Sequence, residues 1–208
     1  IENGNYNARS PYSSGIFSIS TVLISTSFAK SDVVSSPAFD DFRDNRIIVA
    51  NRLAIAKGID IGNPANLDTD GYPLGFGKNN QAVLLPAFLA AYSGSNATDA
   101  SLGIFKSMPL PNWSIRYNGF MRYEFFKNNF KRVSFQHNYR SSYTINAFRS
   151  NLEFDKNPEG LDKNGNFLNS TIMSNVNLVE QFSPLIRMDF ELKNSLKVLT
   201  EIKKERAL

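Results

Sequence analysis

Residues 66–71 read Asn-Leu-Asp-Thr-Asp-Gly, which matches the first half of a calcium-binding loop. In such loops oxygen ligands at alternate positions surround the ion, and the glycine permits a sharp turn. The candidate ligands are Asn66, Asp68 and Asp70. The loop should close with a glutamate at its twelfth position, but Gly77 stands there. We therefore expect an ordinary Asp/Gly-rich turn, with a calcium site as the weaker alternative.

Two further patterns could support catalysis. Ser27 and Lys30 have the Ser-x-x-Lys spacing of penicillin-binding enzymes, in which the lysine helps to activate the serine. The Ser-Asp-Asn and Lys-Thr-Gly elements of those enzymes are missing, however. His137 has no serine elbow with which to form a triad, so we expect it to pack beside Phe135 and Tyr139. We predict no catalytic residue and no enzymatic activity.

Composition excludes several other classes of site. The chain has no cysteine and a single histidine, which removes disulfide scaffolds, thiol catalysis and nearly all zinc sites. The net charge of +4 is modest, and the basic residues are dispersed among acids, which argues against a nucleic-acid surface. We expect no cofactor and no nucleic-acid partner.

The charged residues of the second half alternate with apolar residues at a period of two, which is typical of strands with two different faces. The polar face comprises Arg116, Arg122, Glu124, Gln136, Arg140, Arg187, Asp189, Glu191 and Lys193. The apolar face comprises Trp113, Ile115, Tyr117, Tyr123, Phe135, Tyr139, Met188, Phe190 and Leu192.

This alternation predicts four antiparallel strands, at about 113–126, 132–149, 167–181 and 186–202. Short turns at 127–130 and 182–185 and a long linker at 155–166 should connect them. An earlier strand is expected at 15–28, after a lead-in at 1–14. If that strand ascends, residues 29–112 form an insert and Trp113 begins the descending strand.

The strands are longer than the 9 to 11 residues that cross a bilayer, and short connections alternate with long ones. No apolar run is long enough for a membrane-spanning helix. We therefore predict an all-β fold, a segment of a large antiparallel transmembrane β-barrel with a partly helical loop insert. The polar face would line the lumen and the apolar face would contact lipid.

The insert should contain two short helices and be extracellular or lie in the lumen of the barrel. Ser36 and Pro37 begin the first helix, and Gly58 ends it. A second, short helix is expected from Pro86. A plug, a cap or a partner-docking loop would fit this position. We also expect the chain to be an excerpt of a longer protein that does not fold alone, because an open arc exposes a lipid-facing stripe and two strand edges.

Several sequence stretches resemble the SprA/Sov family, the outer-membrane translocon of the type IX secretion system. The similar stretches are 7–12 (Asn-Ala-Arg-Ser-Pro-Tyr), 36–39 (Ser-Pro-Ala-Phe), 45–54, 70–73 (Asp-Gly-Tyr-Pro), 85–92 and 109–113 (Pro-Leu-Pro-Asn-Trp). The resemblance implies a very large barrel in the bacterial outer membrane that exports folded proteins and supports gliding motility. It also implies three kinds of partner, namely secreted cargo, a PorV-type barrel and a periplasmic plug protein.

Two other functions remain open from the residues alone. A passive or gated outer-membrane nutrient channel would use the same two-faced strands. A surface β-rich adhesin would instead have shorter strands, whose apolar stripes would be buried against a second sheet.

Overall fold

The computed structural model describes residues 12–32 and 35–208. They form two compact units. The helical unit comprises residues 12–17, 24–32, 35–106 and 145–175, and the sheet unit comprises residues 18–23, 107–144 and 176–208. Most of the expected lead-in at 1–14, and of the motif at 7–12, lies outside the described residues.

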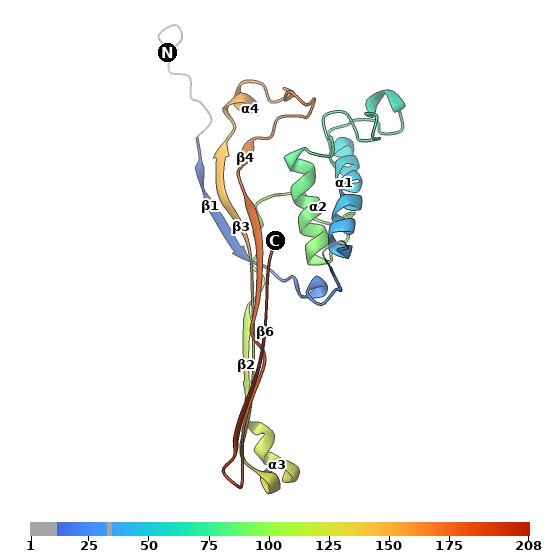
Figure 1. The fold of residues 1–208 in the computed structure, drawn as a ribbon. Coiled ribbons are helices and arrows are strands. Elements are labelled where there is room, and N and C mark those ends of the chain that lie inside the picture. The colour runs from blue at the N-terminus through green and yellow to red at the C-terminus, as the bar shows by residue number, and fades with distance from the viewer. Residues whose placement is uncertain (1–11, 33–34) are drawn as a thin grey trace. The chain divides into compact units, whose positions relative to one another are not determined.

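Six strands form one antiparallel sheet, and helices and turns connect them (Figure 1). The long strand β3 is central: β1 and β2 pair with it, as do β4 and β5, and β6 pairs with β5. Strands β1 and β3 contribute residues to both units. The strands are β1 (Ser14–Ser20), β2 (Trp113–Tyr117), β3 (Phe130–Ser150), β4 (Thr171–Met173), β5 (Val176–Leu192) and β6 (Lys197–Ala207).

The end of β1 and the whole of β2 run in the same direction, antiparallel to β3. The Thr21 amide donates to the Ser141 carbonyl (3.2 Å), and Trp113 is the register partner of Tyr139. Strands β1 and β2 thus follow each other end to end along β3, and the segment between them interrupts what is otherwise one strand position of the sheet. The expectation that a strand of opposite direction precedes Trp113 is therefore wrong. A period-two pattern carries no information about direction. The expected strand at 15–28 also ends early, at Ser20, and is followed by the 3-10 turn η1 (Ile24–Thr26).

The expected strand at 113–126 is wrong beyond Tyr117. Residues 118–129, called the aromatic cap below, contain the 3-10 helix η3 (Gly119–Arg122) and the helix α3 (Glu124–Asn129). Phe120 and Phe126, which interrupt the alternation in the sequence, contact each other with ring centroids 5.2 Å apart. One ring comes from η3 and the other from α3, so the contact packs the two short helical turns against each other and favours this arrangement over a continued strand.

The expected turn at 182–185 is also wrong, because β5 continues through it. A shift in the β5–β6 register between Phe182 and Ile186 accommodates Pro184, whose missing N–H cannot join a regular ladder. The chain reverses at residues 193–196 instead. Ser195 has a φ of 69°, and the Leu192 amide donates to the Leu196 carbonyl (2.8 Å). The strand expected at 186–202 is therefore a hairpin.

The strand expected at 167–181 is divided. Residues 167–170 are a loop, β4 is only three residues long, and β5 begins at Val176. Before the loop, Asn151 caps the short helix α4 (Leu152–Lys156) by accepting a hydrogen bond from the Glu153 amide (3.1 Å). An asparagine at this position satisfies an amide that has no partner within the helix.

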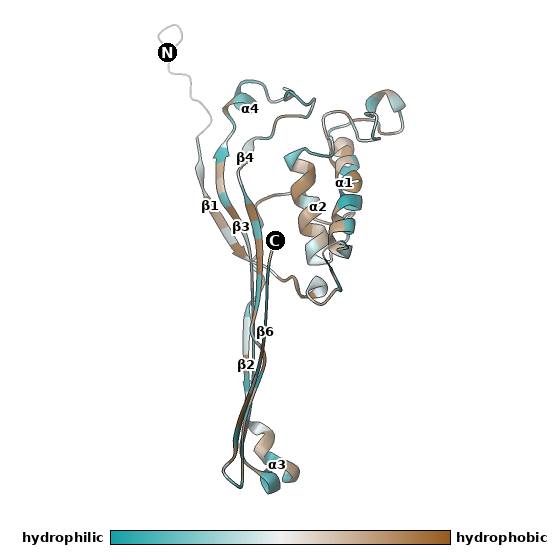
Figure 2. Ribbon diagram, viewed as in Figure 1, coloured by the Kyte–Doolittle hydropathy of each residue, from teal (hydrophilic) through white to brown (hydrophobic). Residues whose placement is uncertain are grey.

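The core of the helical unit lies between α1 (Pro37–Ala56) and α2 (Gln81–Ser93). Small residues at their contact let the two helices approach closely, among them Ala50, Ala54, Ala87 and Ala90. Figure 2 colours most of α2 as apolar, in agreement with its burial. None of the helices in the described part of the chain has the length and apolar character needed to cross a membrane.

Helix α2 begins at Gln81, five residues before the expected start. Asn80 caps it, with its side-chain oxygen accepting from the Ala82 amide (2.8 Å). Pro86 lies inside the helix and removes one hydrogen bond from its second turn. Gly94 ends the helix with a φ of 68°. The cap residue, rather than the proline, marks the start of this helix.

Candidate functional site

The sheet unit has one apolar face. Direct partners of an antiparallel pair project to the same side of the sheet. The β2–β3 register joins Ile115 to His137, and the β5–β6 register joins Ile186 to Ile202. Contact between the rings of Tyr139 and Phe182, with centroids 4.9 Å apart, places both pairs of strands on one continuous face. The sequence-predicted residues on this face are Trp113, Ile115, Tyr117, Phe135, Tyr139, Met188, Phe190 and Leu192.

Part of the apolar face lacks a cover within the described residues. Ile115 is 48% exposed, Ile186 39% and Ile202 50%. A soluble sheet usually buries such a stripe against a second layer. Ile186 and Ile202 are direct cross-strand partners on β5 and β6, and Ile115 lies on β2 on the same face, so exposed apolar side chains occur on three strands of this face.

The opposite face is polar and carries charges of both signs. Arg187 is the register partner of Glu201, and Arg132 lies 3.5 Å from Asp189. Exposed pairs of this kind contribute only about 0–1 kcal/mol each to the free energy of unfolding, so their main effect is to keep this face hydrated. The predicted residues that the structure brings to this face are Arg116, Gln136, Arg140, Arg187, Asp189 and Glu191.

A cavity of about 350 Å³ lies on the polar face beside the aromatic cap. Arg116, Arg132, Gln136 and Asp189 contribute polar groups to its lining. Arg116 and Gln136 are direct partners on β2 and β3, and the Gln136 amide oxygen, turned toward the guanidinium, accepts from its Nη2 atom at 2.8 Å. The polar side chains of this cavity therefore pair with one another, Arg116 with Gln136 and Arg132 with Asp189.

A buried ionic cluster, called the root clamp below, closes the other end of the apolar face. Arg206 and Glu180 are direct partners on β6 and β5, 3.1 Å apart, and Glu180 is 1% exposed. The Tyr139 hydroxyl donates to Glu180 (2.8 Å) and accepts from the Leu23 amide (2.8 Å). Arg206 also donates to the Leu23 carbonyl (3.2 Å). The clamp thus binds both backbone groups of Leu23, just after β1 ends and the chain leaves the sheet.

Four predicted site residues do not lie on a strand, and a fifth lies on the predicted face but is not exposed there. Arg122, Tyr123 and Glu124 belong to the aromatic cap, and Lys193 begins the hairpin turn, so none of these four is on a strand. Tyr139 is on the apolar face but is fully buried, because the root clamp and Trp113 cover it. Glu180 and Arg206 were missed; the one signal in the sequence was Glu180, a charge between Leu178 and Phe182 in an apolar stripe.

The calcium candidates are engaged in a turn. Asp68 accepts from the amides of Asp70 and Tyr72, Asp70 binds Lys78 at 2.7 Å, and the Asn66 amide donates to the Asp60 carbonyl. Gly71 supplies the positive φ of 81° that the turn requires. The described residues contain no group of three or more metal-ligating side chains.

The two catalytic candidates occupy structural positions. Ser27 is buried directly after η1, away from the start of any helix, and Lys30 is exposed. His137 lies with Nδ1 2.6 Å from the Leu185 carbonyl, so that nitrogen donates, and its ring contacts Trp113 and Phe182. These arrangements hold the β-strands and the η1 turn in place.

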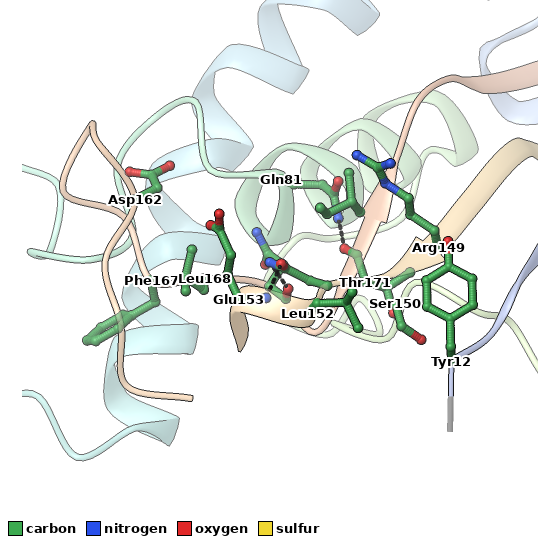
Figure 3. Close-up of a pocket in the computed structure, with 13 residues that line it drawn as sticks. Tyr12, Gln81, Arg149, Ser150, Leu152, Glu153, Asp162, Phe167, Leu168 and Thr171 are labelled. Carbon is green, nitrogen blue, oxygen red and sulfur yellow. Dashed lines mark hydrogen bonds between the residues drawn. The ribbon is translucent and has the colours of Figure 1, made fainter. Parts of the chain in front are cut away.

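A second cavity, of about 500 Å³, lies in the helical unit (Figure 3). Gln81 lines this cavity and binds β4: its side chain donates to the Thr171 carbonyl (2.8 Å) and accepts from the Met173 amide (3.0 Å). Arg149, Glu153 and Asp162 contribute charge to the lining. Side-chain and backbone amides beside this cavity join residues 75–81, at the start of α2, to residues 166–173, which include β4.

This join involves a closely packed backbone contact. The Phe167 amide donates to the Gly75 carbonyl (2.8 Å), and the Asn166 side chain accepts from the Gly77 amide (2.9 Å). Asn80, which caps α2, also donates to the Gly75 carbonyl (3.1 Å). We call this set of contacts the amide latch.

No family model matches the chain, and no curated protein matches it significantly.

Proposed function

We propose that this chain forms part of the wall of a bacterial outer-membrane channel that exports folded proteins. The two-faced sheet carries the proposal, because it combines an incompletely covered apolar face with a charged opposite face. In a transmembrane barrel the first face contacts lipid and the second lines an aqueous lumen. Strands β3 and β5, at 21 and 17 residues, exceed the length that crosses a bilayer.

The apolar face has two physical limits that match a bilayer. The aromatic cap lies at one end, and the charged root clamp lies at the other. Between them β3 runs from Phe130 to Tyr139, about ten residues, which is the length of a tilted membrane-crossing strand. A buried ion pair would be costly at the centre of a bilayer, so its position at the edge of the band supports this boundary.

The connections also follow the outer-membrane pattern. The aromatic cap and the turn at 193–196 connect strands at one end, and the longer segment at 151–170 connects them at the other. In bacterial barrels the short connections are periplasmic and the long ones extracellular. Leu23, where the chain leaves the β1–β2 line, lies over the apolar face, which in a barrel would be the outer side of the wall.

The nature of the transported molecule rests on the resemblance to the SprA/Sov family. That resemblance supplies secreted proteins as cargo, and a PorV-type barrel and a periplasmic plug as partners. A polar wall with charges of both signs suits the passage of folded proteins, since it offers no large apolar area to which a cargo could adhere. A nutrient channel is the alternative function.

Single cysteines along β5 would test the wall. The chain has no native cysteine, so a membrane-impermeant maleimide applied to intact cells reports the introduced residue once labelling of the parent protein without that cysteine is subtracted. We expect labelling at 187, 189 and 191, which face the polar side, and protection at 186, 188 and 190. Labelling that ignores this alternation would contradict the proposal.

The same variants separate the two kinds of channel. Attachment of a bulky polyethylene-glycol maleimide at position 187 or 189 should block secretion of protein cargo, whereas cells with the unmodified variants should secrete normally. If small-solute uptake fell while secretion continued, the nutrient channel would be the better assignment.

A further inference from the structure

The aromatic cap and its neighbours form a continuous chain of ring contacts. Tyr117 contacts Phe120 with centroids 4.8 Å apart, and Phe120 contacts Phe126 at 5.2 Å. Phe126 in turn contacts Phe130 (5.9 Å), and Phe130 contacts Phe190 on β5 (5.9 Å). This packing gives the two short helical turns a fixed shape that neither would have in isolation.

Other side chains of the cap are largely exposed to solvent, although the Phe125 ring also contacts that of Phe126, with centroids 5.3 Å apart. Phe125 is 69% exposed and Tyr123 60% exposed. Arg122 and Lys127, from the same two turns, are exposed and form no ion pair among the described residues. Large exposed aromatic rings combined with unpaired cations are unusual on a surface that meets only water, and typical of a surface at a membrane–water interface.

The cap is attached to the sheet, so its height along the strands is fixed. The Lys193 amide donates to the Asn129 carbonyl (3.3 Å), and the Lys131 ammonium donates to the Ser195 hydroxyl (2.9 Å). Figure 1 shows α3 beside the β5–β6 turn at the same end of the sheet unit. The exposed rings therefore lie just past the end of the apolar face.

We infer that the aromatic cap is an interfacial anchor that binds the phospholipid headgroup layer on the side of the short connections. Tyr123 and Phe125 enter the boundary between headgroups and acyl chains, and Arg122 and Lys127 contact lipid phosphate. This inference rests on the proposed function, which sets the strands across the bilayer, and it adds a lipid-binding role for four residues that are not on any strand.

The depth of the cap can be measured separately from the accessibility of the wall. The whole channel protein to whose wall this chain contributes, with Phe125→Cys or Tyr123→Cys labelled with an environment-sensitive fluorophore, is reconstituted into vesicles of phosphatidylethanolamine and phosphatidylglycerol. Nitroxide lipids carry the quencher either near the headgroup or near the middle of the acyl chain. Lys163→Cys, in an exposed turn of the helical unit, is the aqueous control.

At both cap positions we expect a blue-shifted emission relative to position 163, with stronger quenching by the shallow nitroxide than by the deep one. Emission as red as that of the control would overturn the anchor, even if the β5 labelling pattern still supported the wall. Stronger quenching by the deep nitroxide would overturn the interfacial position. A blue shift without quenching by either lipid would identify a protein contact instead, and would also overturn the anchor.

Discussion

Replacement of Arg206 by methionine should lower the free energy of opening of the sheet unit by about 3–5 kcal/mol, the usual cost of leaving one buried charge without its partner. Glu180 is 1% exposed, and Arg206 is its direct cross-strand partner at 3.1 Å. The guanidinium also donates to the Leu23 carbonyl, so the substitution loosens the root of the insert. Native-state hydrogen exchange at the Leu23 and Leu178 amides would measure the change.

An exposed pair on the same strand provides the matched control. Lys203 lies 3.6 Å from Glu201, and their side chains are 56% and 28% exposed, against 19% for Arg206 and 1% for Glu180. Lys203→Met should therefore change the free energy of opening by less than about 1 kcal/mol. The double variant Glu180→Leu with Arg206→Met should recover much of the loss, because it removes both charges. Equal effects of Arg206→Met and Lys203→Met would show that the clamp does not stabilise the sheet.

Gly75→Ala should destabilise the amide latch by about 2–5 kcal/mol, from overpacking together with backbone strain. An alanine Cβ at this position would clash with Cε2 of Phe167, and the φ of Gly75 is +85°, which favours glycine. Phe167 cannot withdraw freely, since its ring packs 5.2 Å from that of Phe76. Exchange of the Phe167 amide, which donates to the Gly75 carbonyl, would report the loss directly.

Gly71→Ala separates the two causes. Its φ of +81° is nearly the same, but no heavy atom lies within 4 Å of the added Cβ. This control should therefore cost only the backbone strain, about 1–2 kcal/mol. A second variant, Gly75→Ala with Phe167→Ala, should lose less than the sum of the two single changes because the clash is removed. If Gly71→Ala and Gly75→Ala had the same effect, close packing against Phe167 would not contribute to the latch.

Alternation placed most of the predicted face residues on the correct side of the sheet. Arg187 and Asp189 are polar-face residues, and Met188 and Phe190 are apolar-face residues, because the side-chain period of a strand is independent of its partner. The alternation gave a wrong prediction between Asn118 and Asn129, where apolar and polar residues still alternate in part but the chain forms two short helical turns. Phe120 and Phe126 were the signal of that helix, since both broke the polar stripe.

Turns were harder to predict than faces. Ser183-Pro184 has the composition of a turn, but the strand passes through it with a shift of register, and Asn194 and Ser195 make the actual turn. Both sites contain turn-forming residues, so composition could not choose between them. Register with β6 decided the outcome, because a reversal at 182–185 would leave Arg187 without its partner Glu201.

The sequence by itself determined the antiparallel strands with two chemically different faces, the helix beginning at Pro37, and the Asp68–Gly71 turn, because each depends on side-chain periodicity or on a local capping group. Only the tertiary structure decided that β1 and β2 share one line of strand, that Glu180 meets Arg206, and that Gly75 meets Phe167. Each of these contacts joins residues distant in the chain, and the pairing of strands, which local residue patterns do not encode, brings them together.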